Sequence, residues 1–246
     1  MAQLIWPFIR IGAFVMVMPV IASSFVPQRV RLILALALTL VIAPVLPGLP
    51  AVDILSFAGI VLVFQEIVTG IAMGFVVQLI FDAITLGGQV ISMSMGLGFA
   101  VFVDRQRGVN VPVLGQLFLM LGMLTFLSLD GHLALIQVLA DSFRIMPISE
   151  GGLSHAATSG LLQWSSQLFV VAVKIALPAI TALIVVNLSF GVMSRAAPTL
   201  NLFAVGFPVA MLLGFVVIFL SIDGLTANVS RSLGDALAML PVLLGS

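Results

Sequence analysis

Charged side chains are rarer in this chain than a soluble protein of its size tolerates. Its 246 residues include nine basic and nine acidic ones, while 62% are hydrophobic. A water-soluble globule of this length needs a polar surface that such a composition does not supply. The composition therefore predicts a protein that resides in a membrane, or in a protein assembly inserted in one.

The rest of the composition argues against several kinds of site. The formal net charge is zero and cysteine is absent, so nothing favours nucleic acid, and disulfides and thiolate metal sites are excluded. His132 and His155 are too few for a metal cluster. Asp130-Gly131-His132 looks like an acid–base pair, but neighbours in sequence do not face each other on a helix, and a histidine at a loop end is favoured. Because no nucleophile-elbow, zinc-protease or phosphate-loop motif occurs, we predict no enzymatic activity and no cofactor.

The apolar segments predict an all-α membrane protein with long, kinked helices and helical hairpins, packed into a multi-subunit assembly. No linker or repeat divides it, so residues 1–246 are interpreted as one integral domain that begins without a removable signal segment. The expected helices cover residues 5–26 with a break at Pro19, 32–46, 54–86, 89–103, 113–129, 161–192 and 200–222.

Single residues predict where several of these helices begin, break or bend. Asp53 is the expected N-cap of the third helix. Gly87 and Gly88 are the expected break after it, and Pro178 predicts a kink in the sixth. Residues 130–160 are expected to form a more polar connection, and the moderately apolar tail 223–246 to lie at an interface or on a partner.

The basic residues in the loops do not define one membrane topology. If residues 54–103 cross once, the richer loops alternate and the N-terminus lies outside with six crossings, but one crossing then holds fifty residues. If they cross twice, the alternation fails after the following loop. Both interpretations violate a rule for lipid-embedded helices. We therefore expect much of the chain to pack against other subunits and to protrude from the bilayer.

Four charged residues interrupt otherwise apolar stretches: Arg10, Glu66, Asp82 and Lys174. Glu66 and Lys174 lie deepest, where an unpaired charge is costly, so both should have partners. Ion pairs or hydrogen-bonded contacts between subunits are favoured over a proton or ion relay, because the chain offers no ladder of titratable groups. Asp82 is interpreted as a polar residue at a helix end.

Glycines four or eight residues apart indicate close helix contact. Gly70 and Gly74 form one such pair, and Gly206 and Gly214 lie on one face of another helix. The alternative, that glycine is simply frequent in membrane helices, stays open.

Residues 91–104, ISMSMGLGFAVFVD, combine methionine and phenylalanine with small residues directly before the polar loop 104–112. Methionine is flexible and repacks around changing shapes, and together with phenylalanine it can seal a pore by excluding water. Ordinary helix packing with methionine as filler is the alternative, and composition alone favours it.

Two groups of residues carry a resemblance to a known family. The first comprises residues 102–104 (FVD), 110–114 (NVPVL) and 131–133 (GHL). The second, more specific group comprises residues 187–203 (NLSFGVMSRAAPTLNLF) and 206–208 (GFP). Across essentially its whole length, the chain resembles the FliR-type flagellar biosynthesis proteins.

The resemblance implies an export-gate subunit of the flagellar type III secretion system, in the bacterial inner membrane and flagellar basal body. In that family one copy joins several FliP-type and FliQ-type subunits in a helical assembly that exports unfolded proteins, and an FlhB-type switch protein is a further expected partner. The implied pore plug and gasket comprise Met93, Met95, Phe99, Phe102, Val103, Asp104, Arg105, Gln106, Arg107 and Gly108. Helix-end or intersubunit contacts are expected at Glu66, Asp82, Lys174, Asn187, Arg195 and Asn201.

One departure and two alternatives accompany this resemblance. Relatives often have proline after the aspartate of the loop, where this chain has Arg105, and Arg107 adds a second positive charge. The alternatives are a stand-alone secondary transporter or channel with Glu66 and Lys174 as its coupling site, and the equivalent SctT-type subunit of an injectisome.

Overall fold

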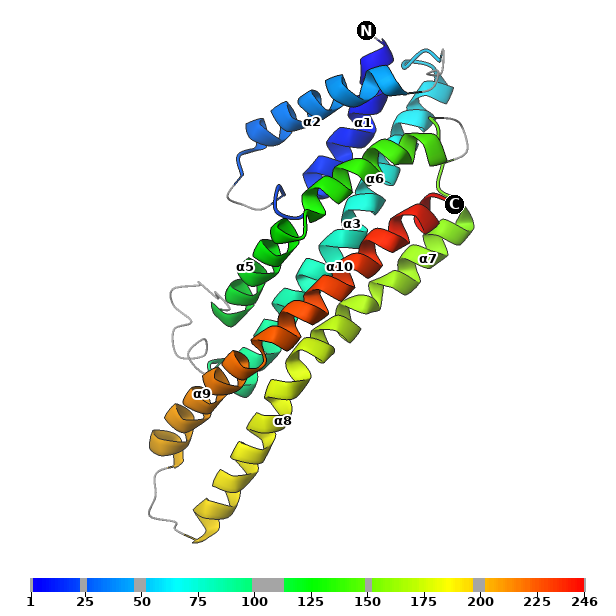
Figure 1. The fold of residues 1–246 in the computed structure, drawn as a ribbon. Helices are drawn as coiled ribbons and strands as arrows, with labels where there is room; N and C mark the ends of the chain where they lie inside the picture. The colour runs from blue at the N-terminus through cyan, green and yellow to red at the C-terminus, as the bar shows by residue number, and fades with distance from the viewer. Residues whose placement is uncertain are drawn as a thin grey trace. The chain divides into compact units, whose positions relative to one another are not determined.

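The computed structural model describes residues 2–22, 26–46, 52–98, 113–148, 152–196 and 202–245, and these residues form helices and turns but no strand (Figure 1). The expected all-α class is confirmed. The elements are α1 (Ala2–Val17), α2 (Gln28–Ile42), a 3-10 turn η1 (Ala43–Val45), α3 (Phe57–Ser94), α5 (Val113–Ser128), α6 (Gly131–Ile145), α7 (His155–Ser165), α8 (Gln167–Ala196), α9 (Leu202–Leu220) and α10 (Ile222–Leu244).

The longest helix, α3, runs through the position where the sequence predicted a break. It has 38 residues and is therefore about 57 Å long. A Cβ atom at Gly88 would lie 2.8 Å from the carbonyl oxygen of Leu114, and one at Gly87 would lie 3.0 Å from Cγ2 of Ile175. The predicted break is wrong because these glycines let neighbouring helices approach α3.

The start of α3 also differs from the prediction. The hydroxyl of Ser56 accepts a hydrogen bond of 3.0 Å from the backbone N–H of Gly59, as an N-cap does. Asp53 instead accepts one of 3.1 Å from the N–H of Leu55 in the preceding turn. Ser56, and not Asp53, therefore caps α3.

Two helices occupy much of the stretch that was expected to be a polar connection. The buried side chains of α6 include Leu135, Leu139 and Phe143, four residues apart, which is helical spacing. The hydroxyl of Ser154 caps α7 by accepting a 3.0 Å bond from the N–H of Ala157. The connection was mispredicted because a helix with one apolar face has a low average hydropathy.

The C-terminal segment forms α10, a helix of the fold, and its place at an interface or on a partner stays a prediction. Val229, Leu233, Ala236 and Leu240 on α10 are buried at helical spacing. Its exposed side chains include Asp223, Arg231 and Asp235. One face of α10 thus packs inside the chain while the other is polar.

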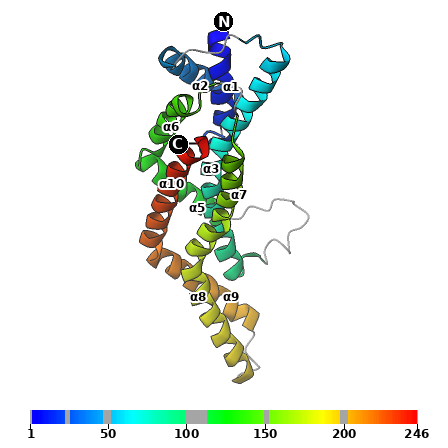
Figure 2. The ribbon, with the colours of Figure 1, turned by 90° about the vertical axis from the view of Figure 1, so that its right-hand side faces the viewer.

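The helices form two compact units. The first combines residues 1–81, 126–167 and 232–246, and the second combines residues 82–125 and 168–231. In the first unit α1 contacts α2, and Figure 2 shows α1 beside both α2 and α3. The core of this unit consists of large side chains, which include Trp6, Phe14, Phe81, Phe126 and Phe143.

The second unit has a core of smaller side chains along α8. Ala172, Ala176 and Ala179 are buried on one face of that helix, and Gly87 of α3 lies against Ala172. Many large apolar side chains of α8 and α9 remain exposed. They include Phe169, Val173, Leu177, Val185, Leu188, Leu212, Val216 and Phe219.

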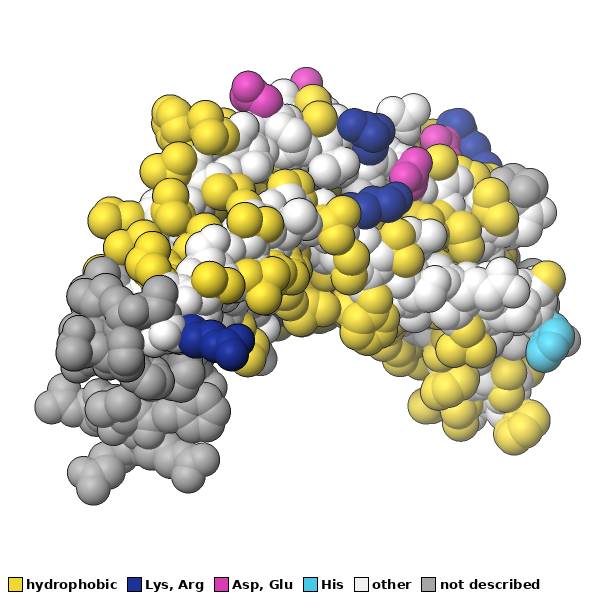
Figure 3. Space-filling model, turned by 90° about the horizontal axis from the view of Figure 1, so that it is seen from below, with side chains coloured by type: hydrophobic (Ala, Val, Ile, Leu, Met, Phe, Trp, Pro, Cys, Tyr) yellow, Lys and Arg dark blue, Asp and Glu magenta, His cyan; other side chains and the backbone are white. Residues whose placement is uncertain are grey.

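Three helical stretches among the described residues are long and apolar enough to cross a membrane. They are Gln28–Val45, Phe57–Ser94 and His155–Arg195, and the number rises to five if each of two bent helix pairs is one span. Hydrophobic side chains cover much of the face shown in Figure 3, and most of its charged side chains gather toward the upper edge of the view. Such a surface requires lipid or protein around it.

Candidate functional site

The charged site of the first unit is a buried ion pair between α1 and α3. The Nε of Arg10 lies 2.6 Å from one carboxylate oxygen of Glu66, and an Nη lies 2.9 Å from the other. The side chains are 0% and 3% exposed. This two-point geometry is the strong form of an arginine–carboxylate contact.

The rest of the Arg10 guanidinium is bound by α6 and the residue that follows it. Its other Nη donates to the backbone oxygen of Ser142 at 3.1 Å and to that of Met146 at 2.9 Å. The ring of Phe143 lies beneath the guanidinium carbon, 4.4 Å away. Because both charges and their hydrogen-bonding atoms find partners, burial is compensated and three helices are held in one register.

Small residues on α3 allow this geometry. Gly70 lies one turn after Glu66, and a Cβ atom there would overlap the backbone oxygen of Arg10. At Gly74 a Cβ atom would lie 2.9 Å from Cβ of Val17. The close helix contact predicted from Gly70 and Gly74 is confirmed.

The pairing of Arg10 with Glu66 was not foreseen, although both were noted as charges in apolar stretches. The apolar surroundings of Glu66 and Lys174 in the sequence predicted a partner for each but did not identify it. The missed signal was the opposite sign of the charge at position 10. Since Glu66 is bound within its own unit, nothing in the structure favours a coupling site made of Glu66 and Lys174.

Lys174 lies on the exposed face of α8. Its neighbours Val173 and Leu177 are 56% and 55% exposed, whereas Ile175 and Ala176 on the opposite face are buried. Among the residues that the structure describes, no carboxylate is within ion-pair distance of Lys174. This lysine is thus a cation on an apolar surface.

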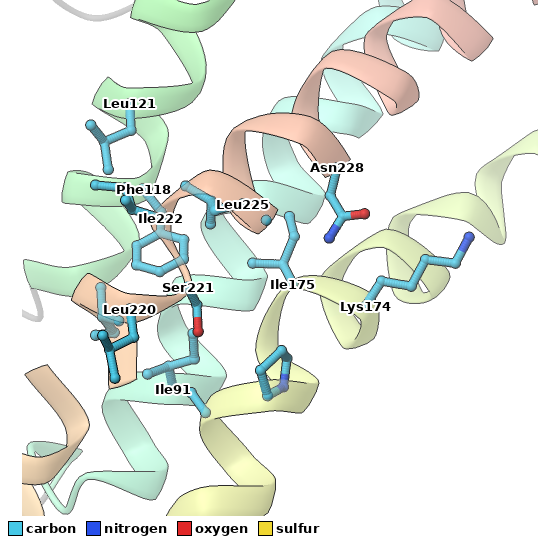
Figure 4. A pocket seen from close by; sticks show the side chains of 14 residues that line it. Ile91, Phe118, Leu121, Lys174, Ile175, Leu220, Ser221, Ile222, Leu225 and Asn228 are labelled. Atoms are coloured by element: carbon cyan, nitrogen blue, oxygen red, sulfur yellow. The ribbon is translucent and has the colours of Figure 1, made fainter. Parts of the chain in front are cut away.

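Beside Lys174, the second unit contains a cavity of about 230 Å³ (Figure 4). The chain bends by 58° between α9 and α10 at Ser221, and this bend forms one wall. Apart from Lys174, Ser221 and Asn228, the lining is mostly apolar, and its larger side chains are Ile91, Phe118, Leu121, Ile175, Leu220, Ile222 and Leu225. Figure 4 shows the Lys174 side chain directed away from these apolar side chains.

The described part of the predicted gasket separates into two environments. Met93, near the end of α3, is 70% exposed, while Met95 is 1% exposed. Met95 lies against Gly214 of α9, where a Cβ atom would be 2.5 Å from its Cγ. The other predicted plug residues, Phe99 and 102–108, lie outside the described residues.

The remaining predicted contact residues lie on two helices. Asp82 is exposed in the middle of α3, so its interpretation as a helix-end residue is wrong because α3 continues to Ser94. Asn187 and Arg195 are exposed on the C-terminal half of α8, with Arg195 in its last turn. Asn201 lies outside the described residues.

His132 lies in the first turn of α6, next to the residue that begins the helix. Its Nδ1 is buried and has no hydrogen-bond partner among the described residues. Asp130, the residue before α6, makes no side-chain cap bond. The structure therefore places His132 inside the first turn of α6, and not at the end of a loop as the sequence favoured.

Comparison with known proteins gives one consistent result. Residues 1–236 match the family described as bacterial export proteins, family 1. The chain is 40% identical over 209 residues to the flagellar biosynthetic protein FliR of Escherichia coli (strain K12), an alignment that covers 85% of this chain and 80% of that relative. It is 39% identical over 215 residues to FliR of Pectobacterium carotovorum subsp. carotovorum, covering 87% and 82%.

A more distant relative aligns over still more of the chain. FliR of Aquifex aeolicus (strain VF5) is 30% identical over 234 residues, which is 94% of this chain and 90% of that protein. The family match therefore extends over both units and over the segments that carried the resemblance in the sequence. The chain belongs to the bacterial export proteins of family 1, among which the flagellar FliR proteins are its relatives.

Proposed function

We propose that this chain is a subunit of the flagellar type III protein export gate and helps to form and seal the pore through which unfolded proteins leave the cytoplasm. The observation that carries this function is the family match over residues 1–236. The matched relatives are flagellar proteins, which favours a flagellar over an injectisome system. Its place is the bacterial inner membrane, in the flagellar basal body.

The partners proposed for the gate are FliP-type and FliQ-type subunits and an FlhB-type switch protein. The exposed apolar side chains of α8 and α9 support this proposal, because an apolar face needs a covering surface. In the assembly the whole chain acts as one integral domain. Asp82, Lys174, Asn187, Arg195 and Asn201 are proposed to contact partner subunits, whereas Glu66 makes its ion pair inside the chain.

The gate is proposed to close with the loop after α3. Residues 104–108 occlude the lumen, and Met93, Met95, Phe99, Phe102 and Val103 form the compressible seal beside them. The exposure of Met93 supports its role, because an exposed methionine repacks easily. Met95 supports this seal by holding the end of α3 against Gly214 of α9.

The chain is proposed to work without catalysis. The buried carboxylate of Glu66 in the first unit is occupied by Arg10. We expect the energy for export to come from other components of the apparatus, which use this subunit as part of the channel wall.

Replacing residues 104–108 by a Gly/Ser linker of equal length tests the plug. Ion leakage through the reconstituted complex should rise, because a flexible linker fills the lumen less well. The same linker at residues 47–51, a proline-containing stretch elsewhere in the sequence, is the matched control and should leave leakage unchanged. An assembled complex with an unaltered leak after the 104–108 replacement would remove the plug assignment.

Expression with and without partners tests the gate against the transporter alternative. A gate subunit should be monodisperse in detergent only when the FliP-type and FliQ-type proteins are co-expressed, because its apolar faces need partner helices. A stand-alone transporter should be monodisperse by itself. A stable, fully lipid-embedded monomer would contradict the proposed function.

A further inference from the structure

We propose that the exposed face of α8 around Lys174 binds an apolar helix of a partner subunit through one carboxylate, while a bulky apolar side chain of that helix enters the neighbouring cavity. This contact rests on the proposed function, since it assigns the chemistry of one surface by which the gate subunit joins its partners.

The surroundings of Lys174 favour an anionic partner. Lys174 lies 19 residues after His155 and 21 before Arg195, the ends of one candidate membrane-crossing stretch. At 1.5 Å per residue both ends are about 30 Å away. Exposed apolar side chains surround Lys174 on this face of α8, so a carboxylate on the surface that covers them would stabilise its ammonium group.

The described part of this chain does not neutralise it. The described ion pairs join Arg10 to Glu66 and Arg144 to Asp141. Both pairs belong to the first unit, whereas Lys174 belongs to the second. A carboxylate that pairs with Lys174 therefore lies beyond the described residues. Because Lys174 is exposed on an apolar face of α8, we place this carboxylate on the partner helix that covers that face.

The cavity beside Lys174 defines the second contact of that surface. Its 230 Å³ is less than the roughly 300 Å³ at which pockets for drug-sized ligands begin, so it offers room for a side chain. Pro178 lines it four residues after Lys174, one helical turn further along α8. A partner helix with a carboxylate and a large apolar residue three or four positions apart matches this spacing.

The extent of the exposed face favours a helix over a lipid molecule. Exposed apolar side chains continue on both sides of Lys174, at Phe169, Val170 and Val173 before it and at Leu177, Ile184 and Leu188 after it. A phospholipid carries its charge at one end of its acyl chains, at the membrane surface. An apolar helix with an internal carboxylate places the charge mid-way along an apolar face, as Lys174 requires.

Charge reversal in the assembled complex tests this contact. The full chain is co-expressed with its FliP-type and FliQ-type partners, and purified complex and swimming motility are measured. Lys174→Glu should lower the yield of complex about tenfold or more, because it faces a carboxylate in an apolar setting. Lys174→Arg should keep most of the yield. The matched control is Arg231→Glu, an exposed cation of the second unit, which should stay within about twofold.

Suppressor selection identifies the partner group. Motile revertants of Lys174→Glu should carry a change of Asp or Glu to Lys or Arg inside an apolar helix of a partner. Because the chain has no cysteine, Lys174→Cys paired with a cysteine at the suppressor position should then give a disulfide-linked dimer of the two subunits under mild oxidation.

Several results would overturn the contact. The first is full assembly of the Lys174→Met variant, and the second is a set of suppressors that alter Asp104 of this chain. The third is a Lys174→Met complex that assembles fully but has lost a bound anionic phospholipid, as seen by native mass spectrometry. Failure of the wild-type chain to assemble would instead overturn the proposed function together with this contact. A wild type that assembles beside a fully assembled Lys174→Met overturns the contact alone.

Discussion

A buried ion pair in the first unit and an exposed lysine in the second show two ways of placing charge in an apolar chain. In the first, Arg10 and Glu66 are buried, bound to each other at two points and surrounded by backbone acceptors of α6 and Met146. In the second, Lys174 is exposed on an apolar helix without a described carboxylate. The buried pair of the first unit is therefore balanced inside the chain, whereas Lys174 of the second unit depends on a covering surface.

The largest effect should follow from breaking the pair in the first unit. Glu66→Gln leaves the buried guanidinium of Arg10 without its counter-charge, and we expect a loss of about 3–5 kcal/mol. The melting temperature of the purified complex in detergent measures it. Asp235→Asn, the removal of an exposed carboxylate in the same unit, should change stability by about 0.5 kcal/mol or less.

A double variant sharpens this test. Replacing both residues by apolar ones of similar volume, Arg10→Met with Glu66→Leu, removes the desolvated charges together, so most of the stability should return. If the double variant were as unstable as Glu66→Gln, the pair would contribute through the helix register that it sets with Ser142 and Met146, and not through charge balance alone.

Features set by residues close together in the sequence were predicted better than features set by residues far apart in the sequence. The helices themselves followed from apolar stretches, and α5 matched its predicted range within one residue. The ends of α3 were less predictable, because Ser56 and Asp53 are both capable of capping and the choice depends on backbone geometry.

Features that join distant residues were harder to predict. Gly87 and Gly88 looked like a break, since a sequence does not show that Ile175 and Leu114 will lie against them. The partner of Glu66 is 56 residues away, beyond any periodic pattern. The predicted plug residues Phe99 and 102–108 lie outside the described residues, so their placement stays a prediction.

A smaller loss of stability should follow when an added methyl group separates two closely packed helices, and the same change can be made in each unit. Gly70→Ala in the first unit and Gly88→Ala in the second each place a methyl group against backbone atoms of a neighbouring helix. We expect about 1–3 kcal/mol from each, measured by the melting temperature of the complex.

Matched glycines control for the backbone effect. A Cβ atom at Gly12 or at Gly191 would have no neighbour within 4 Å in the chain. Alanine at Gly12 should stabilise by up to about 1 kcal/mol through helix propensity. Gly191→Ala can be compared with Gly88→Ala by the loss of stability of the complex. If the two losses are equal, a partner packs against the exposed side of α8 as tightly as the chain packs against its buried side.

The smallest expected effect concerns a single hydrogen bond in the first unit. The indole N–H of Trp164 donates to the backbone oxygen of Val76 at 3.0 Å, and that oxygen lies inside α3. Trp164→Phe should cost about 1 kcal/mol, since the helical carbonyl keeps its own backbone partner. The chain has two tryptophans, so Trp6, fully buried in the same unit, becomes the sole reporter of unfolding by fluorescence.

Ser165→Ala is the neighbouring control, because its hydroxyl bonds within its own helix. A loss as large as that of Glu66→Gln would show that α7 is as essential to the first unit as the ion pair, and that its stability does not centre on α1, α3 and α6.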